Sequence, residues 1–253
     1  MSSSMLCIAE ENLSVAWARA FLAAMEHGVE EVAPLVIAVT GFAGGVVREN
    51  LTIRQALDAT LDQHNTGLTC ETVARTIFPR GLWNPARPRA ELYERYLKIL
   101  PRIRKCRGNQ YGVYFERMIA HGQSRKNQLE HVIQTYAGGN HRRTALQAAI
   151  LDPATDLTDQ RMRGFPCLQQ VAFVPSSEGG LRVIGFYPRQ YIFERAYGNY
   201  LGLCWVGRFI AHELGLELKE MQCFIGVATL GDLGKTALQP LATTLSKLLA
   251  ARG

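Results

Sequence analysis

One cysteine of this sequence, Cys167, lies where a thiol could act as a nucleophile. It follows proline in the segment Phe165-Pro166-Cys167 and precedes the apolar run 168–174, and Arg189 ends the next apolar run. A cysteine attacks as its thiolate, and a nearby guanidinium group favours the charged form and so lowers the thiol pKa. These residue types favour covalent catalysis on an anionic substrate. The alternative is that Cys167 is a small core residue, the usual role of a cysteine in an apolar strand.

Arginines near this cysteine could bind an anion. Arg142 and Arg143 are adjacent, and their guanidinium groups can bond phosphate oxygens in pairs. The alternative is a solvated pair at the start of a strand. Arg189 is harder to assign to the surface, because it ends an apolar strand beside Pro188, where a long cation needs an anionic partner. The pattern predicts an anion-binding site.

Other patterns lack the spacing that their chemistry requires. The glycines of Gly231–Thr236 are too close together for a phosphate-binding loop, and Gly41–Gly45 lacks the spacing of a dinucleotide site. His121, His131 and His141 lie ten residues apart with no ligand geometry. We therefore expect no metal in this protein.

The composition is that of a globular protein with a modest preference for anions. The chain has 253 residues, of which 47% are hydrophobic and 20% charged, and its formal net charge is +6. It has no repeats or low-complexity linkers, so we expect a single domain over 1–253. The basic cluster Arg102–Arg107 is typical of a solvated helix end. Aromatic and basic residues are not interleaved, which argues against a nucleic-acid-binding module.

Cysteine usage and apolar runs predict a cytoplasmic protein outside the membrane. The cysteines lie singly, with neither disulfide nor zinc spacing, as expected in a reducing compartment. Residues 1–7 lack the charged start and long apolar core of a signal peptide. The longest apolar stretch, 197–214, contains Asn199, Arg208 and His212, so we interpret it as a buried helix and not a membrane span.

Hydrophobic periodicity predicts a mixed α/β (α+β) domain without the regular alternation of a doubly wound sheet. A hairpin is expected across the turn Ser176–Gly180, and Asn12 or Ser14 is expected to cap the first helix. The predicted helices are 12–27, 53–61, 71–78, 89–100, 126–136, 197–214 and 236–249. The predicted strands are 34–40, 144–151, 168–174, 181–187 and 221–230.

Residues from about 108 to 230 resemble thymidylate synthase and its pyrimidine-hydroxymethylating relatives in the order and spacing of several motifs. Residues 1–100 form a divergent N-terminal part. The segments that carry the resemblance are Tyr111-Gly-Val-Tyr-Phe-Glu-Arg117, Asn127-Gln-Leu-Glu-His-Val-Ile133, Arg142-Arg143 followed by Asp152-Pro153, Phe165-Pro-Cys167, Tyr187-Pro-Arg-Gln190, Asn199 and Leu216-Glu-Leu218.

The resemblance implies a thymidylate synthase-like mixed β-sheet packed with helices, a homodimer that forms through the sheet, and roles for single residues. Cys167 would be the nucleophile that adds to the pyrimidine ring, with the phosphate-binding Arg189 against its thiolate. Arg142 and Arg143 would reach across the dimer to the phosphate of the neighbouring subunit. Gln190 replaces a serine of the family, and its amide could still donate to phosphate. Asn199 would read the uracil edge, if one residue is deleted between it and Arg189.

Several positions depart from the family. Leu168 stands in place of a histidine, and Thr229 and Gly231 stand in place of the His-x-Tyr pair that holds the sugar hydroxyl. The aspartate between the family's arginine and asparagine has no clear counterpart. The C-terminal segment that closes over folate is replaced by 242–249. Asp152 and Asp156 could act as acids or as turn and cap residues, and Glu49 is a candidate for the catalytic glutamate only through its position before a helix.

Two functions follow. The first is a transferase, either a methyltransferase or a hydroxymethyltransferase. It would move a one-carbon group from 5,10-methylenetetrahydrofolate to C5 of a pyrimidine nucleoside monophosphate through a Cys167 adduct. Asn199 favours uracil as the base. The second is a catalytically divergent protein on the same fold that binds or senses a nucleotide. This is expected if the phosphate-binding arginines were kept while the residues that hold the sugar and close over folate were lost.

Overall fold

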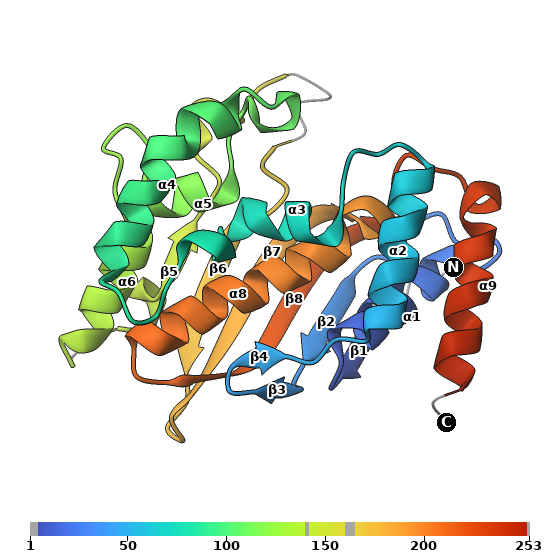
Figure 1. Cartoon of the computed structure of the whole chain (residues 1–253), viewed down its shortest axis with the longest axis horizontal. Coiled ribbons are helices and arrows are strands. Elements are labelled where there is room, and N and C mark those ends of the chain that lie inside the picture. The colour runs from blue at the N-terminus through green and yellow to red at the C-terminus, as the bar shows by residue number, and fades with distance from the viewer. Residues whose placement is uncertain (1–4, 140–141, 160–164, 252–253) are drawn as a thin grey trace.

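A mixed sheet of six strands lies at the centre of the computed structural model, which describes residues 5–139, 142–159 and 165–251 (Figure 1). The strand order is β1-β2-β8-β7-β6-β5; the pairs β1–β2 and β7–β8 are parallel, and the other neighbours are antiparallel. The strands are β1 (Leu6–Glu10), β2 (Leu35–Val39), β5 (Gln147–Ala149), β6 (Gln170–Pro175), β7 (Gly180–Tyr191) and β8 (Glu217–Thr229), and a separate hairpin pairs β3 (Phe42–Ala43) with β4 (Val46–Val47).

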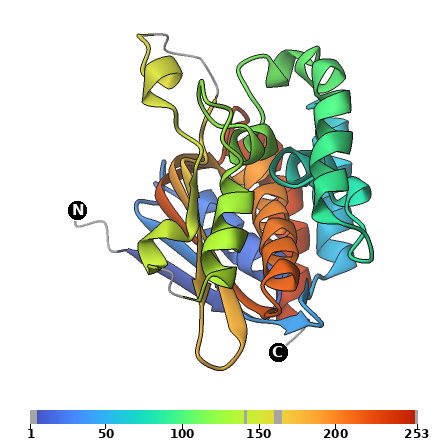
Figure 2. The same ribbon diagram turned by 90° about the vertical axis from the view of Figure 1, so that its left-hand side faces the viewer.

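Helices cover one face of the sheet (Figure 2). The helices of the described residues are α1 (Leu13–Met25), α2 (Leu51–Gln63), α3 (Cys70–Ile77), α4 (Arg89–Arg104), α5 (Tyr114–Ile119), α6 (Gln128–Ala137), α7 (Pro153–Asp156), α8 (Tyr197–Glu213) and α9 (Lys235–Ala250), and the short α7 lies outside the layer that covers the sheet. Helix α8 packs on β7 and β8, and α1 packs on β1 and β2. This one-sided arrangement leaves the two faces of the sheet in different surroundings.

Side chains alternate between these faces along the central strands, as the period of a strand requires. Leu35 and Ile37 of β2 and Cys223 of β8 are fully buried under the helices. On the other side, Phe186 of β7 and Phe224 of β8 are partners in the strand register, and their rings stack with centroids 5.9 Å apart. They are 36% and 41% exposed, respectively. We call the side that carries these two phenylalanines the open sheet face.

Helix α8 can lie deep in the molecule because glycines let a second helix come close. A Cβ at Gly198 would lie 2.5 Å from Cβ of Val73 and 2.7 Å from the carbonyl oxygen of Cys70. At Gly202 it would lie 2.8 Å from the carbonyl oxygen of Ala74. All three distances are too short for a larger residue, so α3 packs directly on the backbone of α8. This contact fixes the first turns of α8, which contain Asn199.

The structure confirms the mixed α/β class, the predicted helices and hairpin, and the burial of the 197–214 stretch. Asn12 caps α1, since its side chain accepts hydrogen bonds from the N–H groups of Ser14 and Val15. The predicted strand 144–151 was too long, because 143–145 form a 3₁₀ turn and only 147–149 pair with β6. Within the described ranges, no helix combines the length and apolarity needed to cross a bilayer.

Candidate functional site

A cavity of about 510 Å³ lies where the end of β7 meets the start of α8. Its wall also includes the loop between α2 and α3, the segment 108–114 that leads into α5, and residues 232–233 after β8. Between β7 and α8 the chain makes a π-helical turn over 192–196. The volume falls within the range of small-molecule sites. Several distant parts of the sequence therefore form one pocket.

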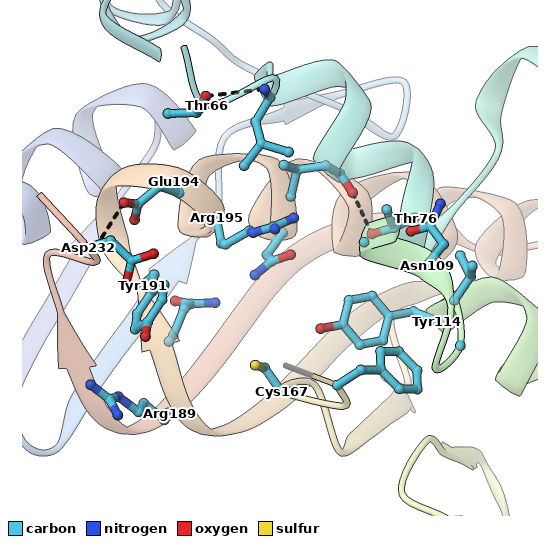
Figure 3. Close-up of a pocket in the computed structure, with 18 of the residues that line it drawn as sticks. Thr66, Thr76, Asn109, Tyr114, Cys167, Arg189, Tyr191, Glu194, Arg195 and Asp232 are labelled. Atoms are coloured by element: carbon cyan, nitrogen blue, oxygen red, sulfur yellow. Dashed lines mark hydrogen bonds between the residues drawn. The ribbon is translucent and has the colours of Figure 1, made fainter. Parts of the chain in front are cut away.

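Four candidate residues from the sequence line this cavity: Cys167, Arg189, Gln190 and Asn199. They come from three places, namely the segment before β6, the end of β7 and the start of α8. Figure 3 shows the Cys167 sulfur and the Arg189 side chain at the same end of the pocket. The fold thus places a thiol, a guanidinium group and two amides around one space.

Arg142 and Arg143 lie outside the wall of this cavity. Both are exposed, at the start of the 3₁₀ turn that leads into β5. Within one chain they do not join the other candidates. Their predicted contact with the phosphate of a neighbouring subunit stays a prediction.

The Cys167 thiol is subject to opposing influences. Cys167 is exposed as a residue, but its thiol faces the cavity, where desolvation raises the thiol pKa above its ordinary value (Figure 3). Arg195, Arg189 and a hydrogen bond from the Tyr114 side chain all act to lower that pKa. Arg189 thus acts in the predicted direction, yet desolvation outweighs the three groups together. The net effect on the thiol pKa is therefore upward.

The two amides of the site are buried. Gln190 is 2% exposed, and its Oε1 accepts a hydrogen bond of 2.9 Å from the Tyr200 hydroxyl. Its Nε2 has no hydrogen-bond partner within the described part of the chain. Asn199 is 4% exposed. A buried donor without a partner costs free energy, so Gln190 is suited to a ligand that presents an acceptor.

An acidic group lines the pocket near Arg195. The Oε1 atom of Glu194 accepts a hydrogen bond of 3.1 Å from the N–H of Asp232, while its Oε2 is buried with no partner among the described residues. Desolvation raises the pKa of the Glu194 carboxyl. A Cβ at Gly231 would lie 1.8 Å from that Oε2, so a larger residue there would displace the Glu194 carboxyl group. Figure 3 shows Glu194 and Asp232 side by side.

The segment that carries Cys167 is supported by aromatic and charged contacts. The Phe165 ring packs against Tyr114, with centroids 5.2 Å apart, and the Arg117 guanidinium lies 5.4 Å from the same ring. Arg117 is held by Asp156 at 2.9 Å and Asp152 at 3.7 Å. These two aspartates therefore anchor an arginine, and Asp152 also caps α7 through the N–H of Ala154. Neither aspartate lines the cavity.

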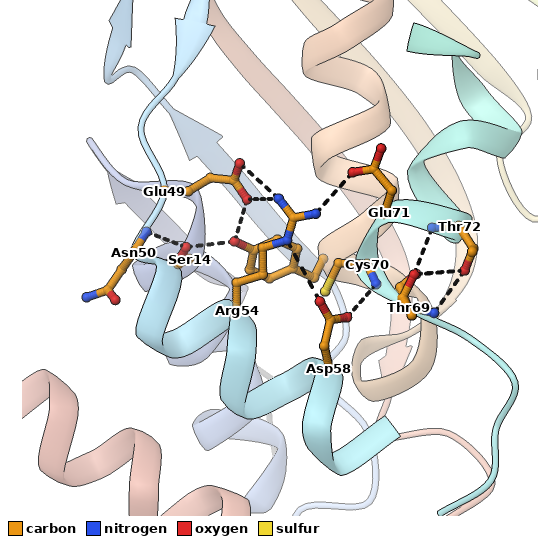
Figure 4. Close-up of polar contacts among 10 residues, drawn as sticks. Ser14, Glu49, Asn50, Arg54, Asp58, Thr69, Cys70, Glu71 and Thr72 are labelled. Carbon is orange, nitrogen blue, oxygen red and sulfur yellow. Dashed lines mark hydrogen bonds and ion pairs between the residues drawn. The ribbon is translucent and has the colours of Figure 1, made fainter. Parts of the chain in front are cut away.

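Glu49, the positional candidate for a catalytic glutamate, belongs to a separate polar network (Figure 4). It accepts a hydrogen bond of 2.8 Å from the Tyr197 hydroxyl and pairs with Arg54 at 3.2 Å. Arg54 in turn pairs with Glu71 at 3.1 Å, and Ser14 bonds the Tyr197 hydroxyl at 2.8 Å. This network joins α1, α2, α3 and α8, and Glu49 is not part of the cavity wall.

Sequence reasoning missed several polar residues of the pocket, among them Tyr114, Glu194 and Arg195. Tyr114 lies inside a motif of the resemblance, but nothing in its spacing relates it to a cysteine 53 positions later. Glu194 lies in the segment where no acidic counterpart was found. Arg195 lies between the partly buried Glu194 and the buried Ala196 in a short helical turn, with no periodic signal. Only the fold brings these side chains into one pocket with Cys167.

The described residues contain no group of three or more histidine, cysteine, aspartate or glutamate side chains arranged to hold a metal ion. No protein-family model matches the sequence, and no curated protein matches it at a significant level.

Proposed function

We propose that this protein is a cytoplasmic, thymidylate synthase-like transferase that adds a methyl or hydroxymethyl group to C5 of a pyrimidine nucleoside monophosphate. The observation that carries the proposal is the convergence of Cys167, Arg189, Gln190 and Asn199 on one cavity. The sequence alone predicts a role in such chemistry for each of the four. A thiol beside guanidinium and amide groups suits an anionic heterocyclic substrate.

Each residue has a role that its chemistry permits. Arg189, with the free Nε2 of Gln190, would hold the phosphate and fix the ring in place. Asn199 would donate to O4 and accept from N3–H of a uracil base. The Cys167 thiolate would add to C6, forming an S–C6 bond while the C5–C6 π pair moves toward O4. C5 would then bond the one-carbon carbon and lose its proton, while the bond from that carbon to the donor nitrogen breaks. Addition of a hydride from the reduced folate (methyl product) or of hydroxide from water (hydroxymethyl product) to the resulting exocyclic methylene would restore the C5–C6 double bond as the thiolate leaves.

The pocket also offers a contact for 5,10-methylenetetrahydrofolate, the proposed donor of the one-carbon unit. A reduced pterin presents N–H groups, and the buried Oε2 of Glu194 is an acceptor without a partner among the described residues. Glu194 and Asp232 are carboxyl groups of the wall that could also take part in proton transfer.

A homodimer through the open sheet face would complete the site. Phe186 and Phe224 present paired aromatic rings there, and exposed aromatic pairs are typical of interfaces. A neighbouring subunit would then supply Arg142 and Arg143 to the phosphate. Both arginines are exposed and outside the cavity of their own chain, which is compatible with action on another chain.

Tritium release tests the transferase. Pyrimidine monophosphates labelled with tritium at C5 (dUMP, UMP, dCMP and CMP) would be incubated with the protein and methylenetetrahydrofolate. We expect release from one of them, and release at background level from Cys167→Ser, because serine cannot supply the thiolate. Cys106→Ser, which removes an exposed thiol outside the cavity, is the matched control. Full turnover by the Cys167 variant would exclude this mechanism.

A second function, nucleotide binding without one-carbon chemistry, is favoured by the raised pKa of the Cys167 thiol, since a protonated thiol is a poor nucleophile. The positions that would hold the sugar hydroxyl also differ, and the hydroxyl of Thr229 is buried without a partner among the described residues. Calorimetry with the same monophosphates distinguishes the two functions. Tight binding with no Cys167-dependent tritium release would establish the second.

A further inference from the structure

We propose that Tyr114 is a catalytic residue whose hydroxyl donates a hydrogen bond to the Cys167 thiolate. The proposal rests on the proposed function for its catalytic meaning, but the contact itself can be tested without any nucleotide. Tyr114 is the first residue of α5 and lines the cavity. Figure 3 shows its hydroxyl on the side of the ring that faces the Cys167 sulfur, and Tyr114 is one of the three groups that act to lower the pKa of that thiol.

Packing contacts hold the segment that carries Tyr114 against the segment that carries Cys167. The Tyr114 ring packs on Phe165, two residues before Cys167, with an angle of 30° between the ring planes. On the same segment, a Cβ at Gly112 would lie only 2.5 Å from the Phe165 ring, so the backbone of residue 112 touches that ring directly. Gly112 also has a φ of +143°, a conformation that other residues rarely adopt. The 112–114 segment therefore fixes the 165–167 segment at two points.

Tyr114 should continue to stabilise the Cys167 thiolate when an anionic ligand is bound, whereas the arginines should do so less. Arg189 and Arg195 are exposed cavity residues, and a phosphate that pairs with them weakens their attraction for a thiolate. The hydroxyl of Tyr114 is neutral, so it has no charge that a bound phosphate could offset. Desolvation raises the pKa of Tyr114 above that of an ordinary tyrosine, so it remains protonated while the thiol ionises. It therefore acts as a donor throughout the pH range in which Cys167 reacts.

The test is the rate at which iodoacetamide alkylates Cys167 as a function of pH, in a Cys7→Ser/Cys106→Ser background that removes the other exposed thiols. Alkylation of the peptide that contains Cys167 is followed by mass spectrometry. In Tyr114→Phe we expect the midpoint to move to higher pH and the rate at neutral pH to fall about tenfold, because a hydrogen bond to a charged group is lost. Tyr136→Phe, on α6 and outside the cavity, is the matched control and is expected to follow the parent protein.

Incorporation of 3-fluorotyrosine at position 114 provides a second variant that keeps the shape of the ring. Its more acidic hydroxyl is a stronger donor, so the midpoint should move to lower pH, opposite to the phenylalanine variant. A Tyr114→Phe profile that superimposes on that of the parent, or fluorotyrosine and phenylalanine shifts of the same sign, would overturn the proposal. If the midpoints shift as expected but the protein releases no tritium, the contact between Tyr114 and Cys167 is supported and the proposed transferase activity is refuted. In an active enzyme, Tyr114→Phe should lower kcat while KM stays near that of the parent.

Discussion

Cys167 shows how one residue's chemistry depends on the balance of its surroundings. Desolvation raises the pKa of its thiol, and two arginines with a tyrosine oppose that effect. Sequence reasoning identified the thiol and Arg189, because proline, cysteine and arginine carry recognisable patterns. It missed the size of the desolvation and the contributions of Arg195 and Tyr114, since both depend on atoms brought together by tertiary packing. Residue types were therefore predictable here, and the resulting pKa was not.

Arg195 is expected to affect the thiol more than Arg189 does. It is the stronger of the two charges that lower the pKa of Cys167. Arg195→Gln should therefore raise that pKa further than Arg189→Gln, each by less than about two units. Because the parent pKa lies above the ordinary thiol value of 9.0, alkylation should still increase as pH rises through that value.

The iodoacetamide profile measures these shifts, and Arg102→Gln, an exposed arginine outside the cavity, serves as the control. A larger shift in Arg189→Gln, or a parent profile that levels off below pH 9.0, would contradict this account.

Among the elements, α4, α6 and α8 are joined by a single arginine. Arg89 of α4 donates from Nε and Nη2 to both carboxylate oxygens of Glu130 on α6, at 2.7 and 2.8 Å, and reaches Glu213 of α8 at 3.2 Å. Hydrophobic periodicity predicted all three helices but could not indicate that their ends meet. The same limit applies to the short β1 and to α5, which carry too few periodic residues to be recognised without their neighbours.

The Arg89 contacts predict a pH-dependent contribution to stability. The hydrogen bonds from Arg89 lower the pKa of the Glu130 carboxyl below its ordinary value of 4.5. A group with a lowered folded pKa stabilises the protein above the unfolded pKa and loses this effect as pH falls through the folded pKa. Glu130→Gln should therefore lower the free energy of unfolding by about 1 kcal/mol near neutral pH, and by progressively less in acid.

Urea denaturation at neutral pH and at a pH well below 4.5 measures this difference. Glu91→Gln breaks the more exposed pair between Arg87 and Glu91, so it is a matched control that should change stability little. If Glu130→Gln destabilises the protein equally at both pH values, the ion pair is not the cause.

On the scale of the whole molecule, the main feature is a sheet with helices on one side only (Figure 2). The class of the fold followed from apolar runs and periodicities. The order of the strands did not, because an apolar run identifies a strand without identifying its neighbours. β1 and β8 flank β2 although more than 200 residues separate them in sequence, and no local pattern carries that information.

The open sheet face predicts self-association. We expect the parent protein to sediment as a dimer at micromolar concentration. Phe224→Asp should sediment as a monomer, since a buried unpaired carboxylate at the centre of an interface is strongly unfavourable. Leu51→Asp changes an exposed leucine on α2 and should leave the dimer intact. A parent protein that sediments as a monomer would exclude self-association. A Phe224→Asp variant that remains a dimer would place the interface elsewhere.

If the stacked phenylalanines hold two chains together, binding of nucleotide in the pocket would depend on the protein concentration. If arginine side chains of a second chain contribute to each pocket, dissociation of the dimer on dilution removes part of the anion-binding charge while each chain stays folded. Turnover per chain would then fall on dilution, and an isolated subunit would retain its thiol and its cavity while holding the nucleotide only weakly.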